Sequence, residues 1–113
     1  MKTQKVTFIS KEALFEMIEN KEPFKLVEVL AKEDYAGGHL PGAISIPVSE
    51  LETASPSVLP DKNERIVVYC ASFLCSASTG AARTLQSHGY TNVLDYKGGK
   101  QDWNTAGLPL MRT

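Results

Sequence analysis

The sequence predicts an α/β fold, in which one domain over residues 1–113 has a central, mainly parallel five-stranded sheet with helices on both faces. Short apolar, β-branched runs alternate with helical patterns along the chain, which is typical of parallel sheets. The run Ile66–Tyr69 is apolar throughout, as expected of a strand that is covered on both faces. A chain of 113 residues suits one hydrophobic core.

The first strand is expected over Val6–Ile9, followed by a helix over residues 11–19 with Ser10 as its N-cap. Residues at helical spacing predict the face of this helix that meets the core: Leu14, Phe15 and Ile18. Residues 25–30 are expected to form the second strand, and Lys32–Tyr35 a single helical turn.

A loop rich in glycine and proline, Gly37–Gly42, leads to a third strand over Ala43–Pro47. Ser49 and Glu52 have the spacing of a capping box that opens a short helix, which Pro56 and Pro60 are expected to interrupt.

The fourth strand, Ile66–Tyr69, precedes a helix that begins after Ser76 and ends at Gly89. Small and apolar residues mark the buried face of this helix: Ala77, Ala81, Ala82 and Leu85. A fifth strand over Asn92–Tyr96 and a last helix over 100–106 complete the pattern.

The composition excludes several classes of protein. The apolar share of 42%, the charged share of 22% and the net charge of −1 give no reason to expect binding to nucleic acid or to an anionic membrane. No apolar run approaches the roughly 20 residues needed to span a bilayer, and Met1–Lys5 lacks the apolar core of a secretory signal. Two cysteines are too few for a disulfide scaffold, so we expect a cytoplasmic protein whose cysteines are chemical.

A candidate active site lies between the fourth strand and the helix that follows it. Cys70 ends the strand and Cys75 lies close to the helix start. Ligands gather at the carboxyl ends of strands in such sheets, and a helix N-terminus favours an anion or a thiolate. Cys70 and Cys75 are therefore the catalytic candidates, and the other residues of the loop are expected to bind substrate: Ala71, Ser72, Phe73, Leu74, Ser76, Ala77 and Ser78.

Several segments, in this order and spacing, resemble the rhodanese-like domain, a family of sulfurtransferases. The resemblance extends from Ile9 to Pro109. It rests on Val27–Val29, Asp34–Tyr35, Gly38–Pro47, Val67–Cys70, Gly89–Val93, Gly98–Gly99, Trp103 and Ala106–Pro109.

The resemblance implies a sulfurtransferase that needs no cofactor and no metal. In the family, a cysteine thiolate takes sulfane sulfur from a donor to form a persulfide, which a nucleophilic acceptor then discharges. The loop amides stabilise the thiolate and the persulfide. The expected partners are a small donor (thiosulfate, polysulfide or persulfide) and a thiol or protein acceptor.

The loop departs from the usual pattern of the family. Ala71 and other small residues stand where arginines are common, the nearest arginine is Arg83, and Leu30 also replaces a common arginine. The loop is longer than usual and has the spacing Cys-x4-Cys, which resembles a recurrent variant of the family. Because a small dianion requires a cationic pocket, we expect poor activity with thiosulfate unless Lys97, Lys100 or Arg83 supplies a charge.

Individual residues have more than one interpretation. Cys70 is a nucleophile or a buried structural cysteine, and Cys75 is the persulfide carrier, a resolving thiol or a residue without chemistry. Phe73 and Leu74 form a lid or a docking patch, and Trp103 is expected in the core.

Three polar residues also have alternatives. A zinc site of His39, His88 and the two cysteines is disfavoured, because the Cys-x4-Cys spacing is loose and His88 lies at the far end of the helix that begins near the cysteines. His39 is instead expected to pin its loop and His88 to cap helix carbonyls. Glu28 is expected to anchor a loop through backbone amides, with a general base as the alternative.

Three other functions compete with sulfur transfer. A phosphatase with a Cys-x5-Arg loop would need an arginine where Ser76 stands. A non-catalytic interaction module would not need the cysteine at the strand end. A dithiol redox switch would need the Cα atoms of Cys70 and Cys75 within about 7 Å.

Overall fold

Five strands form the central sheet of the computed structural model, which describes residues 5–112. They are β1 (Thr7–Phe8), β2 (Lys25–Glu28), β3 (Ile44–Ser45), β4 (Ile66–Tyr69) and β5 (Val93–Tyr96). Their order across the sheet is β1-β5-β4-β2-β3, and every pairing is parallel. This confirms the predicted parallel sheet, in which β4 is the central strand.

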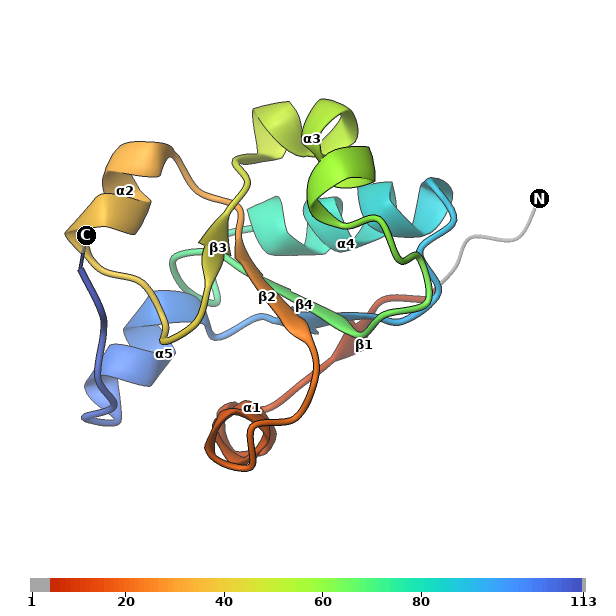
Figure 1. Ribbon diagram of the computed structural model, residues 1–113. Helices are drawn as coiled ribbons and strands as arrows, with labels where there is room; N and C mark the ends of the chain where they lie inside the picture. The colour runs from red at the N-terminus through yellow and green to blue at the C-terminus, as the bar shows by residue number, and fades with distance from the viewer. Residues whose placement is uncertain (1–4, 113) are drawn as a thin grey trace.

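Helices cover both faces of the sheet, as predicted (Figure 1). They are α1 (Lys11–Glu19), α2 (Lys32–Gly37), α3 (Leu51–Val58), α4 (Ala77–Ser87) and α5 (Gly99–Thr105), with a 3₁₀ turn η1 (Val48–Glu50) before α3. One buried core packs α3 and α4 against the sheet, and a second packs α1 and α5 against its other face. Trp103 belongs to this second core, as expected, and is 1% exposed.

The buried strand β4 sends its side chains alternately to the two cores. Ile66, Val68 and the following Cys70 belong to the core under α3 and α4. Val67 and Tyr69 belong to the core under α1 and α5. The alternation follows from the two-residue period of a strand, and it places Cys70 and Tyr69 on opposite faces of the sheet.

Two helix boundaries follow the local sequence rules. Ser10 caps α1, with its hydroxyl accepting a hydrogen bond from the amide of Ala13 at 3.1 Å. Gly89 has a φ of +93° and its amide bonds to the carbonyl of Gln86 at 3.0 Å, so it ends α4 as predicted.

The predicted capping box at Ser49 and Glu52 is wrong. Ser49 lies inside η1, and the start of α3 has no hydrogen bond from a capping side chain. A residue that is already inside a helical turn cannot take the extended conformation of an N-cap. Pro56 also lies within α3, which continues to Val58.

The buried face of α1 also differs from the prediction. Leu14 and Met17 are buried, whereas Phe15 is 36% exposed and Ile18 is only partly buried. Phe15 packs at the edge of the core, with its ring centroid 6.1 Å from that of Trp103.

The expected lack of a secretory signal falls partly on residues 1–4, which lie outside the described residues. Across residues 5–112, none of the helices has the length and apolar character required to cross a bilayer.

Candidate active site

Cys70 lies directly after β4, at the carboxyl edge of the sheet, and is fully buried. The start of α5 holds its backbone: the amide of Lys100 bonds to the carbonyl of Cys70 at 3.1 Å, and that of Gln101 to the carbonyl of Ala71 at 2.9 Å. Gly99 makes this approach possible, because a Cβ there would overlap the carbonyl oxygen of Cys70. The sheet and α5 together therefore fix the beginning of the loop.

The rest of the loop turns out towards solvent and back to α4. The amide of Cys75 bonds to the carbonyl of Ser72 at 3.0 Å, and the amide of Leu74 lies 3.3 Å from the hydroxyl of Ser72. The tip of this turn presents two apolar side chains to solvent, Phe73 at 62% and Leu74 at 96% exposure.

The two cysteines are free thiols, and the loop brings them together. The thiol of Cys70 donates to the carbonyl oxygen of Cys75 at 3.5 Å. The Cys75 side chain is only partly buried and packs against the core that contains Cys70. The two cysteines therefore lie side by side in one loop, with Cys75 the more accessible.

The ammonium of Lys97 reaches the loop. This ammonium donates to the carbonyl of Phe73 at 3.0 Å and to the carbonyl of Cys75 at 2.5 Å. Lys100 instead lies 3.1 Å from the carboxylate of Glu28, and Arg83 is exposed on α4. All three residues were candidates for supplying charge to the loop. Of the three, only Lys97 places its charged group on the loop.

The two thiols differ in acidity. Burial raises the pKa of Cys70, and its hydrogen bond with Cys75 raises it further, against the opposing effect of the hydroxyl and amide of Ser78. Burial also acts to raise the pKa of Cys75. However, hydrogen bonds from Cys70 and from the amides of Ala77 and Ala71, together with the charge of Lys97, outweigh burial and lower it. Cys75 is therefore the more acidic thiol.

Ser78 lies under Cys70 in the first turn of α4 and is fully buried. Its hydroxyl has no other hydrogen-bond partner among residues 5–112, and it lies close enough to the Cys70 thiol to lower the pKa of that thiol. The neighbouring Thr79 donates to the carboxylate of Asp95 at 2.6 Å, which ties this turn of α4 to β5. A polar donor thus remains free beside the buried sulfur.

Glu28 is part of a buried network that the sequence did not predict. Its carboxylate accepts from the hydroxyl of Tyr69 at 2.9 Å and pairs with Lys100 at 3.1 Å. The Tyr69 hydroxyl in turn accepts from the amide of Leu40 at 3.1 Å. The predicted direct contact of Glu28 with backbone amides is therefore wrong, since Tyr69 stands between the carboxylate and the loop.

Among the described residues, neither histidine forms a hydrogen bond with a thiol. His39 pins its loop as predicted, with Nδ1 3.0 Å from the carbonyl of Tyr35 and its ring stacked on that of Tyr35. His88 does not cap helix carbonyls with its ring, which lies 4.0 Å from Glu52; its backbone amide bonds to Thr84 and Leu85 instead. Within the described part of the chain, no three His, Cys, Asp or Glu side chains cluster as a metal site would require.

Comparison with known proteins places these features in a family. A family model described as "Rhodanese-like domain" matches residues 10–106. "Thiosulfate sulfurtransferase PspE" of Escherichia coli is 35% identical over 77 residues, which cover 67% of this chain and 70% of that protein. The "Putative sulfur carrier protein YrkF" of Bacillus subtilis is 30% identical over 95 residues, 84% of this chain and 49% of that protein.

A solved structure agrees with these sequence matches. The "Human Single Domain Sulfurtranferase TSTD1" has a TM-score of 0.79 and 26% identity, over 89% of this chain and 97% of that one. Several curated relatives are much longer, and the chain spans only 36% to 60% of four of them.

Proposed function

The chain belongs to the rhodanese-like domain family, and from that premise we propose that it is a sulfurtransferase that carries sulfane sulfur as a persulfide on Cys70. The observation that carries the proposal is the position of Cys70 at the carboxyl end of β4, beside the free hydroxyl of Ser78 and the first turn of α4. Relatives named as sulfurtransferases and as a sulfur carrier support the same class of reaction.

Two displacements at sulfur make up the reaction. The Cys70 thiolate attacks the outer sulfur of a donor, the bond between that sulfur and the rest of the donor breaks, and the donor leaves as an anion with the electron pair. A thiolate acceptor then attacks the outer sulfur of the Cys70 persulfide, and Cys70 leaves as a thiolate. Ser78 and the amides at the start of α4 are placed to stabilise both anions.

The donor that suits this site is a persulfide or polysulfide of low charge. Residues 70–79 contain no lysine or arginine. The ammonium of Lys97 is bound to the carbonyls of Phe73 and Cys75, so it offers little to a dianion such as thiosulfate. Steady-state kinetics with both donors tests this, and turnover of thiosulfate that saturates at low concentration would contradict it.

The test of the persulfide carrier uses the two single variants. Each protein is incubated with polysulfide, freed of excess reagent and analysed by intact mass for added sulfur. Cys70→Ala should abolish loading while keeping the far-UV circular dichroism of the wild type, and Cys75→Ala should still load. If Cys75→Ala lost sulfur loading and Cys70→Ala kept it, Cys75 rather than Cys70 would carry the persulfide.

A further inference from the structure

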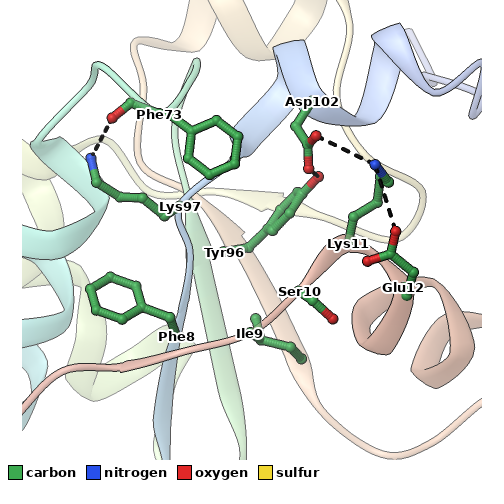
Figure 2. Close-up of a pocket in the computed structure, with 10 residues that line it drawn as sticks. Phe8, Ile9, Ser10, Lys11, Glu12, Phe73, Tyr96, Lys97 and Asp102 are labelled. Atoms are coloured by element: carbon green, nitrogen blue, oxygen red, sulfur yellow. Dashed lines mark hydrogen bonds and ion pairs between the residues drawn. The ribbon is translucent and has the colours of Figure 1, made fainter.

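A cavity of about 650 Å³ opens beside the active-site loop, outside the carboxyl ends of β1 and β5. In open parallel sheets, a crevice at this edge is where ligands bind. Figure 2 shows the rings of Phe73, from the loop, and Phe8, from β1, beside the cavity, and the Lys97 side chain with its ammonium turned to the carbonyl oxygen of Phe73. Both phenyl rings are largely exposed, 57% for Phe8 and 62% for Phe73.

This cavity connects with the thiols through Lys97. The Lys97 ammonium and the Cys70 thiol both bond to the carbonyl oxygen of Cys75, at 2.5 Å and 3.5 Å. Because these distances are two sides of a triangle, the third, from Nζ of Lys97 to Sγ of Cys70, is at most about 6 Å. Lys97 and Phe73, which line the cavity, thus belong to the shell of residues around the loop that encloses Cys70, although neither cysteine lines the cavity itself.

The charges around the cavity compensate one another. Lys11 pairs with Asp102 at 3.4 Å and with Glu12 at 3.8 Å, and the hydroxyl of Tyr96 donates to Asp102 at 2.8 Å. Lys97 is bound to backbone carbonyls, as described above. With its ionic groups already partnered and two phenyl rings facing solvent, the cavity favours an uncharged apolar group over an anion.

We propose that this cavity binds the organic group of the acceptor, an uncharged aromatic or bulky aliphatic thiol, and delivers its sulfur to the persulfide on Cys70. The proposal deepens the proposed function and rests on it. The bound thiolate attacks the outer sulfur, the sulfur–sulfur bond of the persulfide breaks, and Cys70 leaves as a thiolate. The organic hydropersulfide that forms carries the transferred sulfur away, with no net oxidation or reduction.

The kinetic test compares two thiols of similar acidity, phenylmethanethiol and 2-mercaptoethanol. The protein is loaded with polysulfide, and the loss of its added sulfur is followed by rapid-quench intact mass. Phenylmethanethiol should saturate the loaded protein at a concentration at least about tenfold lower than 2-mercaptoethanol. Phe8→Ala should reduce this preference by about tenfold, whereas Val58→Ser, which removes an exposed apolar side chain outside the cavity, should leave it unchanged.

Equal half-saturating concentrations for the two thiols, or a preference that Phe8→Ala leaves intact, would overturn the proposal. A second arm does not depend on sulfur chemistry: phenylmethanol is titrated into the unloaded protein and followed by NMR. Shifts confined to Phe8, Phe73 and Tyr96 would support the cavity even if the protein failed to load sulfur. Shifts elsewhere or none would reject the cavity even if loading succeeded.

Discussion

The hydroxyl of Tyr69 donates a hydrogen bond to the carboxylate of Glu28 at 2.9 Å, and both side chains are fully buried. The two residues are paired in register on β2 and β4, so their side chains point to the same face of the sheet. Through Leu40 on one side and Lys100 on the other, the pair links the loop before β3 to the start of α5. Since the amide of Lys100 also holds the carbonyl of Cys70, this network supports the candidate active site from the opposite face of the sheet.

Replacement of Tyr69 by phenylalanine should destabilise the fold by about 1–3 kcal/mol. The change leaves the amide of Leu40 and one carboxylate oxygen of Glu28 without their partner in a buried environment. Urea denaturation of Tyr69→Phe and the wild type measures the difference. A loss below about 0.5 kcal/mol would mean that water satisfies both groups.

The charge of Glu28 should make stability depend on pH. Burial raises the pKa of Glu28 above its ordinary value of 4.5, against hydrogen bonds from Tyr69 and Lys100 that lower it. The native state then binds more protons than the unfolded state above pH 4.5, so this group's contribution to the free energy of unfolding falls as the pH rises through its folded pKa. Glu28→Gln should lack that fall.

Denaturation curves at several pH values between 4.5 and about 7 provide the measurement. The free energy of unfolding of Glu28→Gln, relative to that of the wild type, should increase with pH across this range. A constant difference would show that Glu28 has the same pKa in both states.

Cys75 should react with iodoacetamide before Cys70 at pH values below 9.0, the ordinary pKa of an unperturbed cysteine thiol. It is the more accessible thiol, and its pKa is lowered whereas that of Cys70 is raised. Peptide mapping after limited alkylation gives the order, and the pH dependence of the rate gives the acidity.

The variant Lys97→Gln tests whether the lowered pKa of Cys75, and not only its accessibility, makes Cys75 react first. Loss of the ammonium should move the midpoint of the Cys75 rate profile to higher pH. Lys62→Gln is the matched control, because Lys62 contacts the carbonyl of His88 away from the loop. Faster labelling of Cys70, or equal midpoints in the two variants, would contradict the assigned acidities.

Cys75→Ser should hold a Cys70 persulfide longer than the wild type does in the absence of an added thiol. In the wild type, the Cys75 thiolate attacks the inner sulfur of the persulfide, sulfide leaves, and a Cys70–Cys75 disulfide forms. Intact mass over time gives the persulfide lifetime, and a non-reduced peptide map detects the disulfide. Equal persulfide lifetimes in the two proteins, with no disulfide detected, would show that Cys75 takes no part in the discharge of the persulfide.

Gly99→Ala should destabilise the fold and disturb the loop. Gly99 has a φ of +64°, and an added Cβ would overlap the backbone of Cys70 and Ala71. Gly80→Ala is the matched control within α4: an added Cβ meets nothing within 4 Å there, so it should stabilise the protein by about 0.4–1 kcal/mol. Thermal unfolding of both variants tests the contrast, and similar stability for the two would show that the start of α5 moves freely.

Local rules were sufficient where the interactions are local. The cap at Ser10 and the end of α4 at Gly89 depend on neighbours within a few residues, and the structure agrees with both predictions. The capping box at Ser49 shows the limit of such rules: its spacing to Glu52 fits the motif, but Ser49 already lies inside the helical turn η1.

The alternation of strands and helices, and the position of Cys70 and Cys75 in one loop at the carboxyl edge of the sheet, could be predicted from the sequence. The groups that surround this loop could not be predicted, because they come from distant parts of the chain. The partners Glu28 and Tyr69 lie 41 residues apart in the chain, and Lys97 lies 22 residues from Cys75. Contacts over such separations depend on strand order and register, which are set by the packing of the whole core and leave no periodic signal in the sequence.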